Sequence, residues 1–209
     1  MFGKFERLTE EKQKRIINAA IKEFATKGYK LASTDTIAKE ADISKGALFN
    51  YFVNKKEMFK YIFEYALNIT LVDFFDKVDL NEKDVIKRYK KAILVKLSLM
   101  QIYPDIFDFM TNVTIEDNIE IKPFIDEKIK EISKDSYSKI FVDIDVSVFK
   151  EGIDAQKAIS IIMWTLEGYS HQLLETYKRM NISLKELELE KIFKELDEYL
   201  SILKQCLYK

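Results

Sequence analysis

The sequence predicts an all-α protein of about nine helices, on three observations. Only five Gly and two Pro occur among 209 residues, so few positions would interrupt a helix. Apolar residues recur at spacings of three and four, which is the period of an amphipathic helix, and no segment alternates like a strand. Residues that cap helices, such as Ser, Thr and Asp, precede several of these apolar stripes.

The first three predicted helices would share one apolar centre. Thr9 is expected to cap the first helix, and Gly28 to end it. Thr34 is expected to cap the second, and Ser44 the third after a turn that includes Asp42. A short helix, a turn of a few residues and another short helix are the layout of a helix-turn-helix.

In a helix-turn-helix the second helix enters the DNA major groove, and its first residues meet base edges. Lys45 could donate to guanine or to a phosphate, Ala47 could contact a thymine methyl, and Asn50 could pair with adenine. Gly46 is unusual inside a helix, and the absence of a Cβ would let the backbone approach DNA. The alternative for any one of these side chains is a solvated surface position.

The rest of the chain is expected to form long helices. Lys55 opens one that runs to about Lys77, with no linker after the helix-turn-helix. Further helices are predicted over 81–102, 104–112, 120–142, 154–180 and 183–208, the last two capped by Asp154 and Ser183. The segment DIDVSVFKEG is predicted to be an irregular connection.

The last predicted helix carries an apolar stripe that needs a partner. Its members recur every three or four residues: Leu189, Ile192, Leu196, Leu200, Leu203 and Leu207. Two such helices from each of two copies would form a four-helix dimer interface. The stripe could instead pack only on its own chain.

Charge is unevenly distributed along the chain. Residues 1–56 hold 12 Lys or Arg and 7 Asp or Glu, whereas the remainder holds 22 and 28. A basic first quarter on an acidic body is typical of a small DNA-binding head attached to a separate regulatory body.

Three strings in the first quarter match a known family in order and at fixed spacing. They are I-A-K-E-A from Ile37, S-K-G-A-L-F-N-Y-F from Ser44 and N-K-K-E-M-F from Asn54. Over residues 10–60 the chain closely resembles the DNA-binding domain of the TetR/AcrR family of transcriptional regulators. The resemblance implies a homodimeric, mostly repressing regulator that responds to a ligand.

The resemblance also implies which residues contact DNA. The positions that match are Thr34, Ser44, Lys45, Gly46, Ala47, Asn50, Tyr51 and Lys55, with the hydroxyls and Lys55 expected on phosphates. Two positions depart from the family. Asp42 stands where Gly is usual, and Asp tolerates the left-handed conformation that the turn needs. Phe49 stands where the family commonly has Tyr, so one hydroxyl is missing.

By resemblance, the body would enclose an apolar ligand cavity with a few polar groups. The residues proposed to line it are Tyr103, Phe107, Trp164 and Tyr169. Most aromatic and Met residues of the body would nevertheless be ordinary core. His171, the only His, is either a donor in this cavity or a surface or interface residue.

The sequence contains no recognisable catalytic, cofactor or metal motif. One His and one Cys cannot form a metal cluster, and GxSxG, GxxxxGK[ST] and GxGxxG are all missing. No run of apolar residues is long enough for a membrane span, and the N-terminus lacks the apolar core of a signal peptide. With Cys206 alone, these features predict a cytoplasmic protein.

The function predicted from sequence is a ligand-responsive repressor. Residues 1–54 would form the helix-turn-helix DNA-binding domain, and residues 55–209 the helical ligand-binding and dimerisation domain. Its partners would be double-stranded operator DNA with a palindromic site, a second copy of the chain and a small hydrophobic effector, and no membrane. Three alternatives remain: a helical dimeric interaction module controlled by a protein partner, a structural module with a vestigial helix-turn-helix, and an enzyme.

Overall fold

The computed structural model is all-helical, as predicted, and describes residues 2–180 and 182–209, with side chains described outside 133–138. Its elements in chain order are α1 (Gly3–Glu6), α2 (Glu10–Leu31), α3 (Thr34–Glu40), α4 (Lys45–Phe52), α5 (Lys55–Lys77), α6 (Val85–Ile102), α7 (Pro104–Thr114), α8 (Lys122–Phe141), the 3-10 turn η1 (Val146–Val148), α9 (Ala155–Arg179), the 3-10 turn η2 (Leu184–Glu186) and α10 (Leu189–Leu207). Within these residues the one β-type contact is an isolated bridge between Phe149 and Tyr208.

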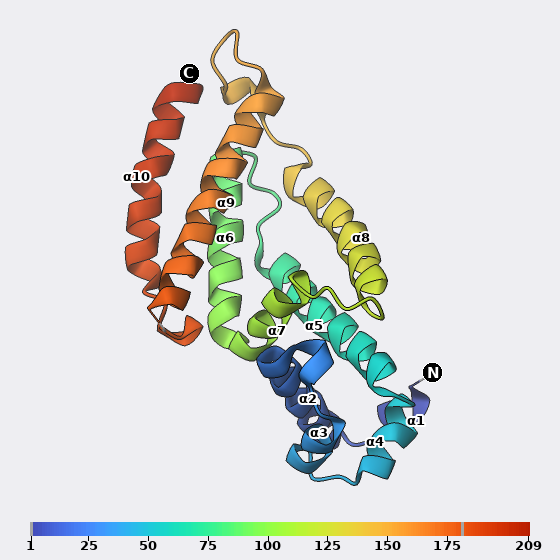
Figure 1. Cartoon of the computed structure of the whole chain (residues 1–209). Helices are drawn as coiled ribbons and strands as arrows, with labels where there is room; N and C mark the ends of the chain where they lie inside the picture. The colour runs from blue at the N-terminus through green and yellow to red at the C-terminus, as the bar shows by residue number, and fades with distance from the viewer. Residues whose placement is uncertain (1, 181) are drawn as a thin grey trace. The chain divides into compact units, whose positions relative to one another are not determined.

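The chain forms two compact units. The first unit comprises Met1–Leu71 and Asp105–Ile132, and the second comprises Val72–Pro104 and Ser133–Lys209. Helices α5 and α8 therefore each contribute to both units. The first unit contains α1 to α4, which Figure 1 draws in blue and cyan.

Local capping determines most boundaries of the first unit. The Thr9 side chain accepts from the Lys12 amide, as predicted, and Gly28 interrupts α2 with a φ of 66°. Helix α3 is capped by Ser33, which accepts from the Thr36 amide, so the prediction of Thr34 as the cap is wrong by one residue. Asp42 has a φ of 55°, the left-handed conformation expected of the turn.

Helix α1 was not predicted, because four residues carry too little periodicity to be recognised. It exists because Phe5, with no exposed surface, packs on α4 and α5. The centroid of its ring lies 4.7 Å from that of Phe52 and 5.2 Å from that of Tyr61. The N-terminal segment is therefore part of the core that supports α4.

In the second unit, α6, α9 and α10 all contact one another, and the three helices run side by side in Figure 1. Helix α9 begins after Asp154, which accepts from the Lys157 amide as predicted. Ser183 caps the turn η2 through a capping box with Glu186, so the last helix starts only at Leu189. The sequence signal at Ser183 was real, but the helix that it begins is a single 3-10 turn.

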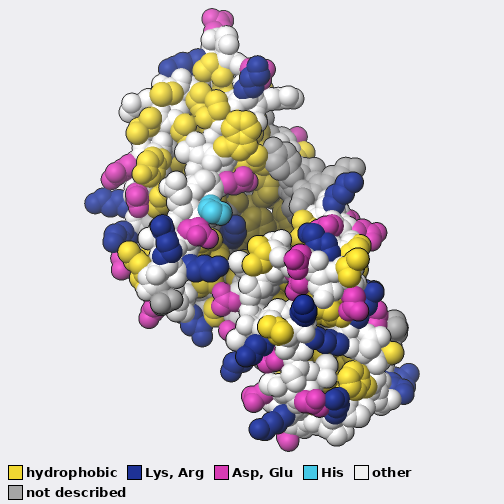
Figure 2. Space-filling view, in the orientation of Figure 1, with side chains coloured by type: hydrophobic (Ala, Val, Ile, Leu, Met, Phe, Trp, Pro, Cys, Tyr) yellow, Lys and Arg dark blue, Asp and Glu magenta, His cyan; other side chains and the backbone are white. Residues whose placement is uncertain are grey.

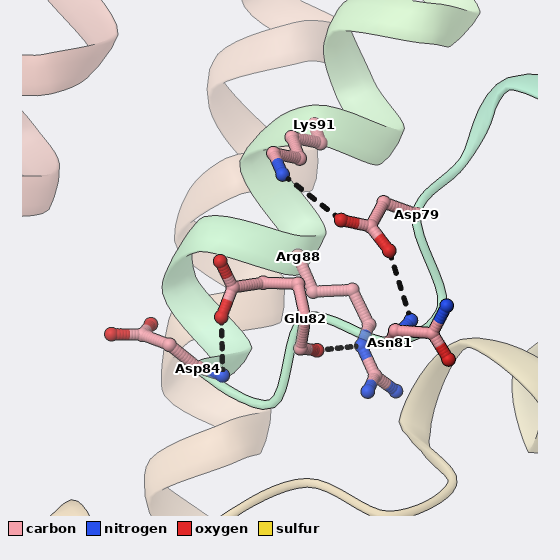
Figure 3. A network of polar contacts seen from close by, with 6 residues as sticks. All are labelled: Asp79, Asn81, Glu82, Asp84, Arg88 and Lys91. Atoms are coloured by element: carbon pink, nitrogen blue, oxygen red, sulfur yellow. Dashed lines mark hydrogen bonds and ion pairs between the residues drawn. The ribbon is translucent and has the colours of Figure 1, made fainter.

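The start of α6 also differs from the prediction, because residues 79–84 form a turn held by polar contacts (Figure 3). Asp79 accepts from the Asn81 amide and pairs with Lys91. Asp84 then caps the helix by accepting from the Lys87 amide. These local acceptors compete with helical bonds, so the helix begins four residues later than the apolar pattern indicates.

Arg88 holds this turn to the C-terminal end of α8, although only 1% of its surface is exposed. Its Nε donates to the carbonyl of Glu82 (Figure 3), and its Nη1 donates to the carbonyls of Ile140 and Val142 at 3.0 and 2.6 Å. The free carbonyls at a helix C-terminus favour a positive charge, so Arg88 caps α8. Its Nη2 has no hydrogen-bond partner among the described residues.

Candidate functional site

The residues expected to contact DNA lie on or beside α4, whose buried face fixes its position. Leu48 and Phe52 are buried, and Ser44 caps the helix by accepting from the Ala47 amide at 3.1 Å, as predicted. Lys45 and Asn50 therefore lie on the exposed face. Ser44 and Gly46 are exposed too, whereas Thr34, Ala47, Tyr51 and Lys55 are half-buried.

Gly46 has no structural role within the chain itself. A Cβ added at this position would meet only the Ser44 Oγ, at 3.9 Å. Gly inside a helix costs about 1 kcal/mol relative to Ala, so a residue with room for a side chain needs another reason to be Gly. Close approach of a second molecule to the start of α4 supplies that reason.

Two basic side chains lie at the exposed face of α4, Lys45 from the helix itself and Lys4 from α1. The Lys45 ammonium pairs with Asp35 of α3 at 2.9 Å, and the Lys4 ammonium donates to the Asn50 Oδ1 at 2.7 Å. Both contacts are exposed, and exposed ion pairs contribute only about 0–1 kcal/mol, so another ligand can replace them. Sequence reasoning missed Lys4, because only the packing of Phe5 brings it beside Asn50.

Lys55 lies at the start of α5 but is engaged with the end of α2. Its ammonium donates to the Lys30 carbonyl at 3.2 Å and lies 5.0 Å from the centre of the Tyr29 ring. Partial burial lowers the pKa of Lys55. Its predicted contact with a DNA phosphate stays a prediction.

Tyr29 connects the end of α2 to the segment between α7 and α8. Its amide donates to Glu116 at 3.0 Å and its hydroxyl to Glu120 at 2.9 Å, while Asn112 donates to the Ala25 carbonyl. Desolvation and the Glu120 carboxylate raise the pKa of Tyr29 to about 12, so the hydroxyl keeps its proton. No sequence signal pointed to this connection, which joins residues about ninety positions apart.

The four proposed ligand-lining residues have different surroundings. The Tyr103 hydroxyl donates to Asp73 of α5 at 2.7 Å, whereas the Tyr169 hydroxyl bonds to Glu195 of α10 at 3.1 Å. Phe107 belongs to the first unit, and Trp164 is 65% exposed on α9. Their lining role stays a prediction, and His171 is an exposed residue of α9.

The central members of the predicted leucine stripe pack within their own chain, so the prediction that these residues form the dimer interface is wrong, whereas Leu189, Leu203 and Leu207 are half-buried. Ile192, Leu196 and Leu200 are at most 4% exposed in the single chain, where α10 contacts α6 and α9. A different set of large apolar side chains remains exposed on these two helices. It consists of Ile161 and Trp164 on α9 and of Tyr199 and Ile202 on α10.

Figure 2 shows hydrophobic side chains gathered where Figure 1 draws the first half of α9.

Among the described residues there is no group of three or more His, Cys, Asp or Glu side chains that could hold a metal ion. None of the described helices combines the length and apolarity that crossing a bilayer requires.

An exposed, capped second helix of a helix-turn-helix, in a basic segment, is the arrangement typical of a DNA-binding domain. Residues 16–62 match the family model described as bacterial regulatory proteins, tetR family. The helix-turn-helix part of the chain is therefore similar to that of TetR-family proteins, which are DNA-binding transcriptional regulators.

Relatives extend this likeness beyond the helix-turn-helix. The chain is 28% identical to the uncharacterized regulator YuxN of Bacillus subtilis over 88% of its own length, but it spans only 60% of YuxN. A TetR family regulator from Chloroflexus aurantiacus superposes with a TM-score of 0.67 at 18% identity, covering 99% of this chain and 98% of the other. FadR of Bacillus subtilis in complex with stearoyl-CoA gives 0.59 at 21% identity, covering 91% and 96%.

Proposed function

We propose that this chain is a repressor that binds a palindromic operator as a homodimer and is released by a small hydrophobic molecule with a long acyl chain. The observation that carries the DNA-binding part is the exposed face of α4. There, Gly46 leaves the backbone open to a second molecule, and Lys45 and Asn50 present polar groups held only by replaceable contacts.

The exposed apolar face of α9 and α10 supports the homodimer. Trp164 lies opposite the buried side of α9, and Gly168 follows it by one turn. A Cβ at Gly168 would meet no atom within 4 Å, so the chain itself does not require Gly there. A second copy packed helix to helix would cover the apolar side chains, and the resulting twofold symmetry matches a palindromic site.

The acyl effector is supported by a relative and by the second unit. The solved complex of FadR from Bacillus subtilis contains stearoyl-CoA. In this chain, an apolar cluster of the second unit keeps several aromatic side chains only partly buried, among them Phe74, Phe75 and Phe141. Incompletely covered aromatic side chains suit a ligand with a hydrocarbon chain.

Operator selection from random DNA with the full chain tests the proposal. Fluorescence anisotropy should then show site-specific binding that weakens steeply with salt, because phosphate contacts release counterions. Stearoyl-CoA should release the DNA, and coenzyme A without an acyl chain should not. Failure to select any site would contradict DNA recognition, whereas tight operator binding that no acyl compound reverses would contradict the effector and favour control by a protein partner.

A further inference from the structure

One face of α6 in the second unit carries Tyr89 and Lys96, and Tyr103 follows directly after the last residue of the helix. Tyr89 and Lys96 share this face because seven residues are close to two helical turns, about 10 Å along the axis. The Tyr89 hydroxyl donates to Glu167 of α9 at 2.8 Å, and the Tyr103 hydroxyl donates to Asp73 of α5 at 2.7 Å. Lys96 lies midway between Tyr89 and Tyr103 in the sequence.

The same face of α6 packs against an apolar cluster. Val78, Ala92 and Ile140 form its buried centre, and Ala92 precedes Lys96 by one turn. Its partly buried members are Phe74, Phe75, Leu80, Tyr89, Val95 and Phe141. The Tyr89 and Phe141 rings lie 5.5 Å apart, and those of Phe74 and Phe75 lie 5.2 Å apart. Lys96 therefore lies at the edge of an incompletely covered apolar surface.

Lys96 differs from its neighbours on α6 in lacking a counter-charge. Lys90 pairs with Asp197, and Lys91 pairs with Asp79 (Figure 3). Among the described residues no carboxylate lies within ion-pair distance of the Lys96 ammonium. The Glu167 carboxylate raises the pKa of Lys96, but Glu167 already accepts from Tyr89.

The Lys96 side chain is accessible to another molecule but partly desolvated. Its side chain is exposed, yet desolvation by neighbouring atoms lowers its pKa, against the opposing effect of Glu167. The atoms beside it on α6 include Ala92 and the ring of Tyr89, which belong to the apolar cluster. An unpaired cation in such a place binds an anion more strongly than it would on a flat, fully hydrated surface.

We propose that Lys96 binds the anionic headgroup of the effector, whose hydrocarbon chain packs on Phe74, Phe75, Tyr89 and Phe141. The inference rests on the proposed function and narrows its effector to a long acyl chain with a negative charge. A free carboxylate and the phosphates of an acyl thioester share this chemistry.

Calorimetric titration of the full-length chain tests the proposal with palmitate, palmitoyl-CoA and the neutral hexadecanol. Lys96→Gln should weaken binding of at least one of the two anions about tenfold or more, because a charge-assisted contact is lost, and should leave hexadecanol unchanged. Lys96→Arg should retain most of the affinity. The anion that responds identifies the headgroup as carboxylate or thioester phosphate.

Lys87→Gln is the matched control, because Lys87 is exposed on the opposite face of α6 and should bind every ligand like the wild type. Thermal unfolding of each variant verifies that the fold is intact. If the wild type binds both anions and Lys96→Gln binds them equally well, the role of Lys96 is wrong while the acyl effector stands. If the wild type binds neither, both the effector and the role of Lys96 fall.

Discussion

Lys45 in α4 and Arg88 in α6 are both cations in the first turn of a helix, but their surroundings are opposite. Lys45 is exposed and has one exposed partner, Asp35. Arg88 is buried and donates to three backbone carbonyls from two separate segments. Both residues are common types in helices, and only their positions in the fold distinguish them.

The difference teaches which charges are available to another molecule. An exposed ion pair contributes little, so a phosphate or a base can replace Asp35 at little cost. The bonds of Arg88 cannot be exchanged without leaving buried carbonyls unpaired, and that is expensive. The surface of α4 is therefore suited to binding, and the start of α6 to holding the second unit together.

The largest effect is expected from replacing Arg88, the buried cation. Arg88→Met should lower the free energy of unfolding by about 3–5 kcal/mol, because three carbonyls and the C-terminal end of α8 lose their donor. Urea unfolding followed by circular dichroism measures this change. Lys87→Met, one position earlier and exposed, should change it by less than about 0.5 kcal/mol. If both substitutions lowered the free energy of unfolding equally, the buried bonds of Arg88 would not stabilise the second unit as described.

A smaller effect is expected from replacing Trp164, an apolar side chain that is exposed whereas other apolar side chains of α9 are buried. Trp164→Glu should weaken the dimer by at least about 2 kcal/mol, or roughly thirtyfold, because a charge would enter the proposed interface. Light scattering over a range of concentrations should show a shift toward monomer, with the thermal stability of the monomer retained because Trp164 is exposed in the single chain. An unchanged mass at all concentrations would show that this face is not the interface.

The smallest effect is expected from replacing Lys45, the exposed cation. Lys45→Met should cost about 1–3 kcal/mol of operator affinity while leaving the stability of the chain unchanged. Asp35→Asn should strengthen operator binding by up to about 1 kcal/mol, because it frees Lys45 and removes a negative charge near DNA. Anisotropy titrations at one salt concentration measure both. Lys39→Met, exposed on α3, is the control, and weaker binding by Asp35→Asn would contradict the competition.

Much of the fold could be predicted because helix boundaries depend on local chemistry. The bounds of α5 agree with the prediction at both ends, and the caps Thr9, Ser44 and Asp154 act as expected. Helix α1 could not be predicted, since Phe5 stabilises it through residues distant in sequence. The start of α10 was wrong because a capping motif does not specify the length of the helix that follows.

The site was less accessible from sequence, for a related reason. Periodicity indicates that one side of α10 is buried, but it does not indicate whether its own chain or a second copy covers it. Likewise, no pattern relates Lys4 to Asn50, Arg88 to Ile140 or Tyr29 to Glu120, because each pair meets only in the folded chain. The family motif predicted the exposed residues of α4 because their spacing lies within one short helix.

The bonds of Tyr29 bear on how regulators of this kind could be recombined. A chimaera joined at the start of α5 would keep Tyr29 and Asn54 from one parent and take the stretch from Asn112 to Glu120 from another. The graft would lose both carboxylates that Tyr29 contacts unless the donor carries acids at those positions. A transplant that also carries residues 105–132 would preserve these contacts, because that stretch belongs to the same compact unit as α1 to α4.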